Sequence, residues 1–569
     1  MENKGKFKQK LEFSKSRSYY QCCLFLQTQT ADPTSLKDKQ NMSLVLKPKE
    51  KTQMIFAEAL EETIKSEKTL TENGAVGYKT TKSSLLDFNF KASSFRNKSE
   101  SEIENAFADA YNENPLLAVK LMFMTGDIRQ GMGERRTFAT CLKWLAKHRK
   151  DVAEKIIGLV PEYSRWDILV DMLGTEVDAK TFELIQSQLV IDTDNCLKGK
   201  PISLLAKWLP SANTSSKETR RKARSLCSRL GMTEKQYRKR LSLLRSHSNV
   251  VEVKMSSNNW DKIAYEAVPS KANLIYRDAF MRHDEARRTE YLDALEKGTA
   301  KINSTALFPY EIVSRYYGRN MPIDSTVEQL WKALPDYANG KGENTLCVID
   351  GSGSMSSGVG ETNVTCRDVA ISLGIYFSEK MPGQFHDKYI TFSENPKLVD
   401  LSNCNTLNEK VQEALRHHEC ENTNIEKVFR LILDTAKSHR LRQDEMPKGV
   451  LIVSDMEFDG AVSLGSFSSG DPWNRPSGDQ FDGMCRALFE TIGDEYRQAG
   501  YELPKLVFWN VCSRTGAVPL QQNKNGVILV SGFSPTIASM VLSQKNDPYD
   551  VLLEKLNSKR YDAVEKALA

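Results

Sequence analysis

The chain has 569 residues, 40% of them hydrophobic and 27% charged, which is the composition of a globular protein and excludes a disordered, collagen-like or fibrous one. Its 79 basic and 74 acidic residues give a formal charge of +5, so a nucleic-acid signal has to be local. Eleven cysteines lack Cys-x-x-Cys or zinc spacing, which argues against a disulfide framework and a structural zinc. No apolar run is long enough to span a membrane, so we expect a cytoplasmic protein with reduced thiols.

The N-terminal region has the weakest pattern. Residues 1–50 are basic and polar without sustained periodicity, so we expect a disordered tail. We also expect residues 1–41 to be dispensable, with Met42 as the candidate start of the native protein. From Gln53 onward, apolar residues recur at helical spacing, which predicts an amphipathic helix over 53–64.

The region 51–338 is predicted to be an all-helical module. Helical segments separated by Gly, Pro or Asp/Ser breaks are expected at 114–124, 138–147, 152–159, 166–173 and 179–189. Short helices that cannot each bury a face alone stack in pairs, so we expect a HEAT-like solenoid.

A Gly-rich, charged segment lies inside this helical module. Gly126–Gly131 has the glycine spacing of a phosphate loop, but Met132 stands where the lysine is needed, so we reject nucleotide binding. Four nearby arginines are assigned either to RNA contact or to structure, and both interpretations stay open: Arg129, Arg135, Arg136 and Arg165.

A basic helix pair is predicted over residues 217–245. Ala223, Leu226 and Leu230 form one apolar stripe, Gly231 suits a helix end, and Thr233 with Gln236 forms a capping box for the second helix. A basic face suits a phosphate backbone, although a merely solvated helix pair is the alternative. The candidate RNA-binding residues are Lys217, Arg220, Arg221, Lys222, Arg224, Arg229, Lys235, Arg238, Lys239, Arg240 and Arg245.

After about residue 340, short continuous apolar runs alternate with helical segments. Strands are expected at 346–349, 389–392, 450–453, 506–509 and 527–530. Runs buried on both faces indicate a mostly parallel, doubly wound sheet covered by helices. We therefore expect a second domain over 339–569, which gives the whole chain an α plus α/β architecture.

Oxygen-bearing side chains follow two of these strands and precede one helix. Asp350, Ser352 and Ser354 come directly after the first strand, Asp455 follows the third, and Thr423 lies just before a helix. Open α/β sheets bind ligands at the carboxyl ends of their strands, and hard oxygen ligands suit Mg²⁺, Mn²⁺ or Ca²⁺. The three segments are expected to converge on one ion.

This pattern resembles the von Willebrand factor A domain and its metal-ion-dependent adhesion site. The resemblance implies that Ser352, Ser354 and Thr423 are direct hydroxyl ligands, with Asp350 and Asp455 nearby. It also implies one open coordination position, which an acidic side chain of a partner or a phosphate oxygen could fill. No nucleophile with an adjacent base is found, and His417-His418 fits a solvated surface pair, so we expect no enzyme.

Several motifs together resemble an uncharacterised family of plant, fungal, viral and bacterial proteins, itself similar to the Ro ribonucleoproteins. They are Arg129-x-Gly-x-Gly-Glu-Arg135, the segments 161–167 and 207–210, and Ser454-Asp-Met-Glu-Phe-Asp459. In Ro proteins, a TROVE module of helical repeats joins a von Willebrand A domain and binds small noncoding RNAs. The resemblance implies a noncatalytic RNA-binding protein whose A domain recruits a partner through a divalent ion. A protein-protein adaptor without specific RNA is the alternative, and a metal-dependent nuclease is the third hypothesis.

Overall fold

The computed structural model describes residues 68–72, 76–248, 250–318, 321–360, 362–392, 395–417, 425–458, 488–518, 527–543, 545 and 547–569. These residues belong to one compact unit that begins at Leu60. The expected tail over 1–50, the candidate start at Met42 and the expected helix over 53–64 lie outside the described residues.

The N-terminal part of the described chain is helical, as predicted, after a short antiparallel hairpin of β1 (Lys68–Leu70) and β2 (Val76–Tyr78). Helix starts follow local chemistry, because Ser99 and Glu102 form a capping box and Asn114 caps a helix with Pro115 in its first turn. The helices are α2 (Ser84–Lys91), α3 (Glu100–Glu113), α4 (Pro115–Gly126), α5 (Arg135–His148), α6 (Lys150–Ile156), α7 (Val160–Tyr163), α8 (Trp166–Asp171), α9 (Asp178–Leu197), α10 (Leu205–Trp208), α11 (Lys217–Arg229), α12 (Glu234–His247), α13 (Val251–Ser256), α14 (Ser270–His283), α15 (Glu285–Glu296), α16 (Pro309–Val313) and α17 (Ser325–Lys332).

The C-terminal part contains a six-stranded mixed sheet in the order β5-β4-β3-β6-β7-β8. Its strands are β3 (Thr345–Asp350), β4 (Lys388–Phe392), β5 (Lys397–Asp400), β6 (Gly449–Ser454), β7 (Lys505–Asn510) and β8 (Val527–Ser531). All neighbours are parallel except β4 and β5. The five strands predicted from apolar runs are confirmed, because each run lies within a strand of this sheet.

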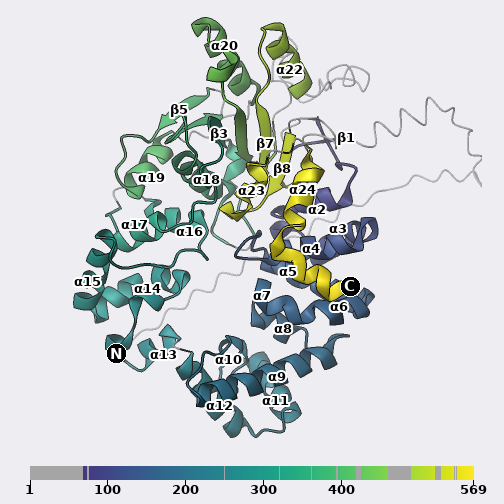
Figure 1. Ribbon diagram of the computed structural model, residues 1–569, viewed down its shortest axis with the longest axis vertical. Helices are drawn as coiled ribbons and strands as arrows, with labels where there is room; N and C mark the ends of the chain where they lie inside the picture. Colours follow the sequence, from purple (N-terminus) through teal and green to yellow (C-terminus); the bar gives the residue numbers. More distant parts are fainter. Residues whose placement is uncertain are drawn as a thin grey trace, which may run out of the picture. The chain divides into compact units, whose positions relative to one another are not determined.

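Helices surround this sheet (Figure 1). They are α18 (Cys366–Lys380), α19 (Leu407–Arg416), α20 (Ile425–His439), α22 (Leu488–Gln498), α23 (Ala538–Val541) and α24 (Pro548–Leu556). The last helix, α25 (Asp562–Leu568), packs on α4 and α6 instead. The sequence analysis missed β5, an edge strand whose four residues bury only Val399, and the hairpin of β1 and β2. Such short strands carry too few residues for a detectable period.

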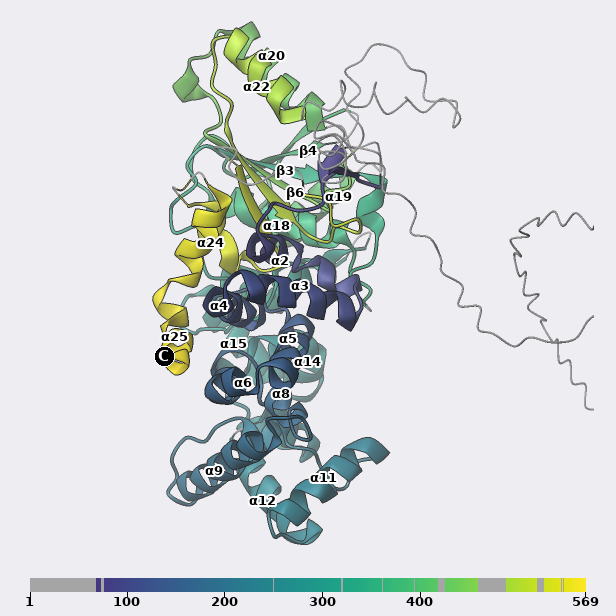
Figure 2. The same cartoon turned by 90° about the vertical axis from the view of Figure 1, so that its right-hand side faces the viewer.

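The helical and sheet regions share one hydrophobic core. Helix α2 packs on β8, and the C-terminal helices α24 and α25 pack on α4. Figures 1 and 2 show the yellow C-terminal helices beside the purple-blue helices α2 to α6. A smaller core joins α13, α14 and α15. The end of the chain thus fastens the sheet region to the first helices.

No helix in the part of the chain that the structure describes is long and apolar enough to cross a membrane.

Candidate metal centre and nucleic-acid interface

The loop after β3 folds back over the end of the strand. Asp350 ends β3, and its Oδ1 accepts a hydrogen bond of 2.9 Å from the Ser352 amide, which folds the loop over the end of the strand. The hydroxyl oxygens of Ser352 and Ser354 lie 2.9 Å apart. Two of the predicted hydroxyl ligands are therefore side by side at the edge of the sheet.

The end of β6 lies at the same edge because β6 pairs with β3 in parallel. The Ser454 hydroxyl donates a hydrogen bond of 2.5 Å to Asp350 Oδ2. The carboxylate of the next residue, Asp455, is fully buried and lies close enough to Ser354 and Asp350 to interact with both. The structure thus brings together four of the five predicted metal residues, Asp350, Ser352, Ser354 and Asp455. The fifth, Thr423, lies outside the described residues.

Two carboxylates of this cluster, those of Asp350 and Asp455, repel one another. Burial raises the pKa of Asp455, and the nearby Asp350 carboxylate raises it further, while Arg514 and hydrogen bonds act in the opposite direction. A divalent ion between the two carboxylates would remove their repulsion. In the described ranges no group of three or more His, Cys, Asp or Glu residues could hold a metal, so an ion at this edge would rely on the serine hydroxyls.

Two charged residues of this site were missed by the sequence analysis. Glu457 is fully buried, and its Oε1 accepts hydrogen bonds from the amides of Arg514 at 2.8 Å and Thr515 at 2.9 Å. Its Oε2 accepts the Glu72 amide at 2.7 Å. Glu457 therefore ties the N-terminal hairpin segment and the loop after β7 to the end of β6. The sequence could have identified Glu457 as a residue of this site, because it lies only two positions after Asp455.

The Arg514 guanidinium reaches into the cluster from the loop after β7. Nη2 lies 3.3 Å from Asp455 Oδ2 and 2.5 Å from Glu72 Oε2. Nη1 donates to the Ser354 carbonyl at 3.4 Å and to the Ser357 hydroxyl. A lone arginine 59 positions beyond Asp455 gives no sequence signal for this contact.

The sequence analysis interprets His417 and His418 as a solvated surface pair. His417 Nε2 lies 2.9 Å from Glu413 Oε1, one helical turn earlier on α19, so this histidine has a carboxylate partner on its own helix. His418 lies outside the described residues.

The basic helix pair forms with the caps that the sequence predicts. Ser216 caps α11, Gly231 adopts a positive φ of 65° after it, and Thr233 with Gln236 forms the capping box of α12. The apolar faces are buried through Ala223, Leu226, Cys227, Tyr237, Leu241 and Leu244. The remaining surface carries the basic side chains.

The structure divides the eleven candidate RNA-binding residues into two groups. Six have side chains without a hydrogen bond or ion pair to any residue that the structure describes: Lys217, Arg221, Lys235, Arg238, Lys239 and Arg240. Three are paired with carboxylates, Lys222 with Asp171, Arg224 with Glu234, and Arg229 with Asp178. The other two donate to backbone carbonyls, Arg220 to Thr214 and Arg245 to Ala206 and Leu209.

Arg245 is a part of the framework. Its guanidinium donates to two carbonyls at 2.8 Å and to the Ser211 hydroxyl at 2.9 Å, which holds the chain before α11 against α12. Burial lowers the pKa of this guanidinium. Its three hydrogen bonds fix a wall of the neighbouring groove.

A groove of about 600 Å³ runs along α12. Lys235, Arg238 and Lys239, three of the six unpaired cations, lie on this side of the helix because their spacing of three and four residues places them on one face. The lining residues are Ser211, Ala212, Asn213, Lys235, Arg238, Lys239, Leu241, Ser242, Arg245, Ser246 and Val253. None of these is acidic, so the groove is positive and offers hydroxyl and amide donors.

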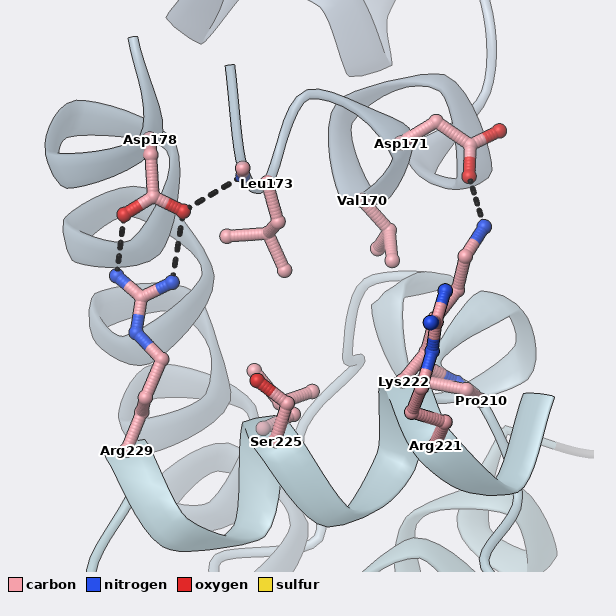
Figure 3. A pocket seen from close by; sticks show the side chains of 11 residues that line it. Val170, Asp171, Leu173, Asp178, Pro210, Arg221, Lys222, Ser225 and Arg229 are labelled. Atoms are coloured by element: carbon pink, nitrogen blue, oxygen red, sulfur yellow. Dashed lines mark hydrogen bonds and ion pairs between the residues drawn. The ribbon is translucent and has the colours of Figure 1, made fainter. Parts of the chain in front are cut away.

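A second pocket, of about 380 Å³, lies between α11 and the α8–α9 region (Figure 3). Its cations are mostly neutralised within the protein. Arg229 makes a bidentate pair with Asp178 at 2.7 and 2.8 Å, and Lys222 lies 3.1 Å from Asp171. This pocket is therefore less suited to an anion than the groove along α12.

The Gly-rich segment after α4 is a structural joint. Its Asp127 is fully buried and accepts two hydrogen bonds from Arg560, while Glu134 accepts one of 2.8 Å from Arg96. A Cβ at Gly131 would lie 1.9 Å from the Met124 carbonyl oxygen, so only glycine fits there. The glycines thus serve close packing of the chain.

The four arginines of uncertain role near this segment all have protein partners. Arg136 donates to the Phe95 carbonyl at 2.8 Å, and Arg129 to the Glu162 carbonyl at 2.5 Å. Arg135 lies 3.4 Å from Asp167. Arg165 pairs with the same Asp167 and stacks over Trp208, with its guanidinium carbon 3.8 Å from the ring centroid. These contacts favour the structural interpretation.

Comparison with known proteins gives matches over most of the chain. Residues 71–156 and 212–344 match a domain of unknown function (DUF2828), and residues 344–566 match another (DUF7788). The uncharacterized protein L728 of Acanthamoeba polyphaga mimivirus is 30% identical over 525 residues, which cover 85% of this chain and 86% of that protein. The chain belongs to the family of this mimivirus protein.

The two domain matches meet at residue 344, directly before β3. The first match includes α11 and α12, and the second includes the Asp350–Ser354 loop and Arg514. Among solved structures, the crystal structure of the Deinococcus radiodurans Ro (RSR) protein is similar with a TM-score of 0.38 and 16% identity, over 84% of this chain and 99% of that chain.

Proposed function

We propose that this protein is a noncatalytic RNA-binding protein and that the groove along α12 holds the phosphate backbone of the RNA. The observation that carries the proposal is the set of unpaired cations in the groove, Lys235, Arg238 and Lys239, with no acidic residue in its lining. The resemblance of the sequence motifs to the Ro-like family supports the same function.

Unpaired cations are the groups that bind phosphate at the lowest cost. A paired residue such as Arg229 would have to leave its carboxylate before it could bind RNA, whereas Arg238 loses only water and counterions. Each phosphate contact releases condensed counterions, which drives binding independently of the base sequence. We therefore expect weak sequence selectivity.

The two alternative functions, a protein-protein adaptor and a metal-dependent nuclease, require different features of the protein. An adaptor would use the helical part as a platform for a protein partner, without affinity for RNA. A nuclease with two metal ions would need clustered carboxylate ligands, whereas the expected ligands in this chain are mainly hydroxyls.

A second proposal concerns the sheet domain, which we propose binds one Mg²⁺, or Mn²⁺ or Ca²⁺, at Asp350, Ser352, Ser354, Thr423 and Asp455. The residues present fit such an ion, because two hydroxyl oxygens, those of Ser352 and Ser354, lie 2.9 Å apart beside the carboxylates of Asp350 and Asp455. When bound, the ion would supply an open coordination position to an acidic side chain of a partner protein or to a phosphate oxygen.

The RNA proposal predicts that charge in the groove matters more than charge elsewhere on the same helix pair. Changing Lys235, Arg238 and Lys239 together to Gln should weaken binding of a single-stranded RNA at least about tenfold at low salt. It should also reduce the slope of log affinity against log salt by about 2, since each single-strand contact contributes about 0.7. Fluorescence anisotropy at several salt concentrations measures both quantities.

The matched control changes Lys217, Arg221 and Arg240 to Gln. These three cations are also unpaired and lie on the same two helices, but none lines the groove. The control should retain most of the affinity and the slope. Equal losses in both variants would show that RNA binds without using the groove. If the wild-type protein showed no affinity for RNA at low salt, the adaptor hypothesis would be favoured instead.

A further inference from the structure

Arg514 and a metal ion would require the same oxygen atom. Asp455 Oδ1 accepts a hydrogen bond of 3.2 Å from the Glu457 amide, and Oδ2 faces the Arg514 guanidinium at 3.3 Å. Both oxygens of Asp350 accept hydrogen bonds from the protein, from Ser352 and Ser454. Among these four oxygens, Oδ2 of Asp455 is the one that the Arg514 guanidinium contacts, so a metal ion at Asp455 would compete with Arg514 for this carboxylate.

The Arg514 side chain has a second anion within reach. Its Nη2 lies 2.5 Å from Glu72 Oε2, and the Glu72 side chain is 54% exposed while its amide is held by the buried Glu457 carboxylate. The guanidinium can thus leave Asp455 and remain paired with Glu72. Such a move leaves the guanidinium paired, and a bound metal ion would replace it as the charged partner of the buried Asp455.

The backbone of Arg514 is fixed independently of its side chain. Glu457 Oε1 holds the amides of Arg514 and Thr515, so the loop keeps its position when the guanidinium moves. The Arg514 Nε is buried and has no hydrogen-bond partner, so the observed position of the side chain is incompletely satisfied. The Arg514 side chain thus contacts two carboxylates at once, Glu72 and Asp455, from a backbone that Glu457 holds.

We propose that Arg514 is a built-in competitor of the metal ion: it neutralises Asp455 when no metal is bound and moves fully onto Glu72 when metal binds. This inference rests on the metal proposal above. It makes Arg514 and Glu72 positioning residues with opposite effects on metal affinity. Arg514 opposes the ion at Asp455, and Glu72 draws Arg514 away from it.

The test is a Mn²⁺ titration of the full chain, followed by electron paramagnetic resonance of free Mn²⁺. Arg514→Gln should raise the affinity about fivefold, because a competing positive charge is removed. Glu72→Gln should lower it about threefold, because Arg514 then has no second carboxylate. Glu343→Gln, which breaks an exposed ion pair with Lys448 in the same domain, should leave it unchanged.

The opposite changes in Mn²⁺ affinity expected for Arg514→Gln and Glu72→Gln distinguish a competitor from a residue that only supports the structure. If Arg514 merely held the loop in place, Arg514→Gln and Glu72→Gln would both weaken Mn²⁺ binding or would both leave it unchanged. Either result would overturn the inference about Arg514. Mn²⁺ binding by the wild-type protein would still support the metal proposal. Absence of Mn²⁺ binding in wild type and in every variant would overturn the metal proposal and this inference together. Circular dichroism of each variant would check that it is folded.

Discussion

Replacing Arg560 by Met is expected to lower the apparent free energy of unfolding by about 3–5 kcal/mol, the usual cost of removing one partner of a buried ion pair. Arg560 donates to both oxygens of the fully buried Asp127, at 2.7 and 3.1 Å. Its guanidinium carbon also lies 4.4 Å from the centroid of the Tyr163 ring. Without Arg560, the buried carboxylate would lose its charged partner. Urea denaturation followed by tryptophan fluorescence measures the change.

Two further variants test this explanation. Arg135→Met breaks an ion pair of 3.4 Å with Asp167 in which the Arg135 side chain is 52% exposed, and should cost less than about 1 kcal/mol. The double variant Arg560→Met/Asp127→Asn should recover part of the loss, because no buried charge then remains. A small effect of Arg560→Met, or no recovery in the double variant, would show that the Asp127 carboxylate is not stabilised in this way.

Changing Asp350 to Asn is expected to weaken Mn²⁺ binding about 100-fold, the upper end of the loss seen when residues around metal ligands are changed. Asn removes the negative charge but keeps an oxygen that can accept the Ser352 amide or the Ser454 hydroxyl, so the loop should remain folded. The same Mn²⁺ titration measures the affinity, and thermal melting reports on the fold.

The control for this variant is Asp400→Asn in the same domain. Asp400 is exposed on the edge strand β5, where it pairs at 2.9 Å with Lys388, the first residue of β4. Asp350 is level with the last residue of β4, so Asp400 lies at the opposite edge of the sheet from the predicted metal residues. Its change should leave Mn²⁺ affinity unaltered. Unchanged affinity in Asp350→Asn, with binding in the wild type, would mean that the ligands lie elsewhere.

The arrangement of elements could be predicted because its signals are local. Val450–Val453 is a continuous apolar run, and such runs become strands buried on both faces. Thr233 and Gln236 are three residues apart and cap α12 as expected. Even the meeting of Asp350 and Asp455 follows from the sequence, since the carboxyl ends of parallel strands share one edge.

Only the tertiary structure decided which charges are available and which are used within the protein. Arg229 and Arg238 have the same character in the sequence, yet Arg229 binds Asp178, 51 positions away, while the Arg238 side chain has no partner among the described residues and lines the groove. Arg560 and Asp127 are 433 positions apart, and Arg514 and Asp455 are 59 apart. Periodicity and capping depend on neighbours within a few residues, whereas an ion pair depends on where the packed core brings distant segments. The sequence by itself therefore determined the helices, the sheet and the oxygen-bearing loop, and the packing of the core decided which arginines hold the protein together.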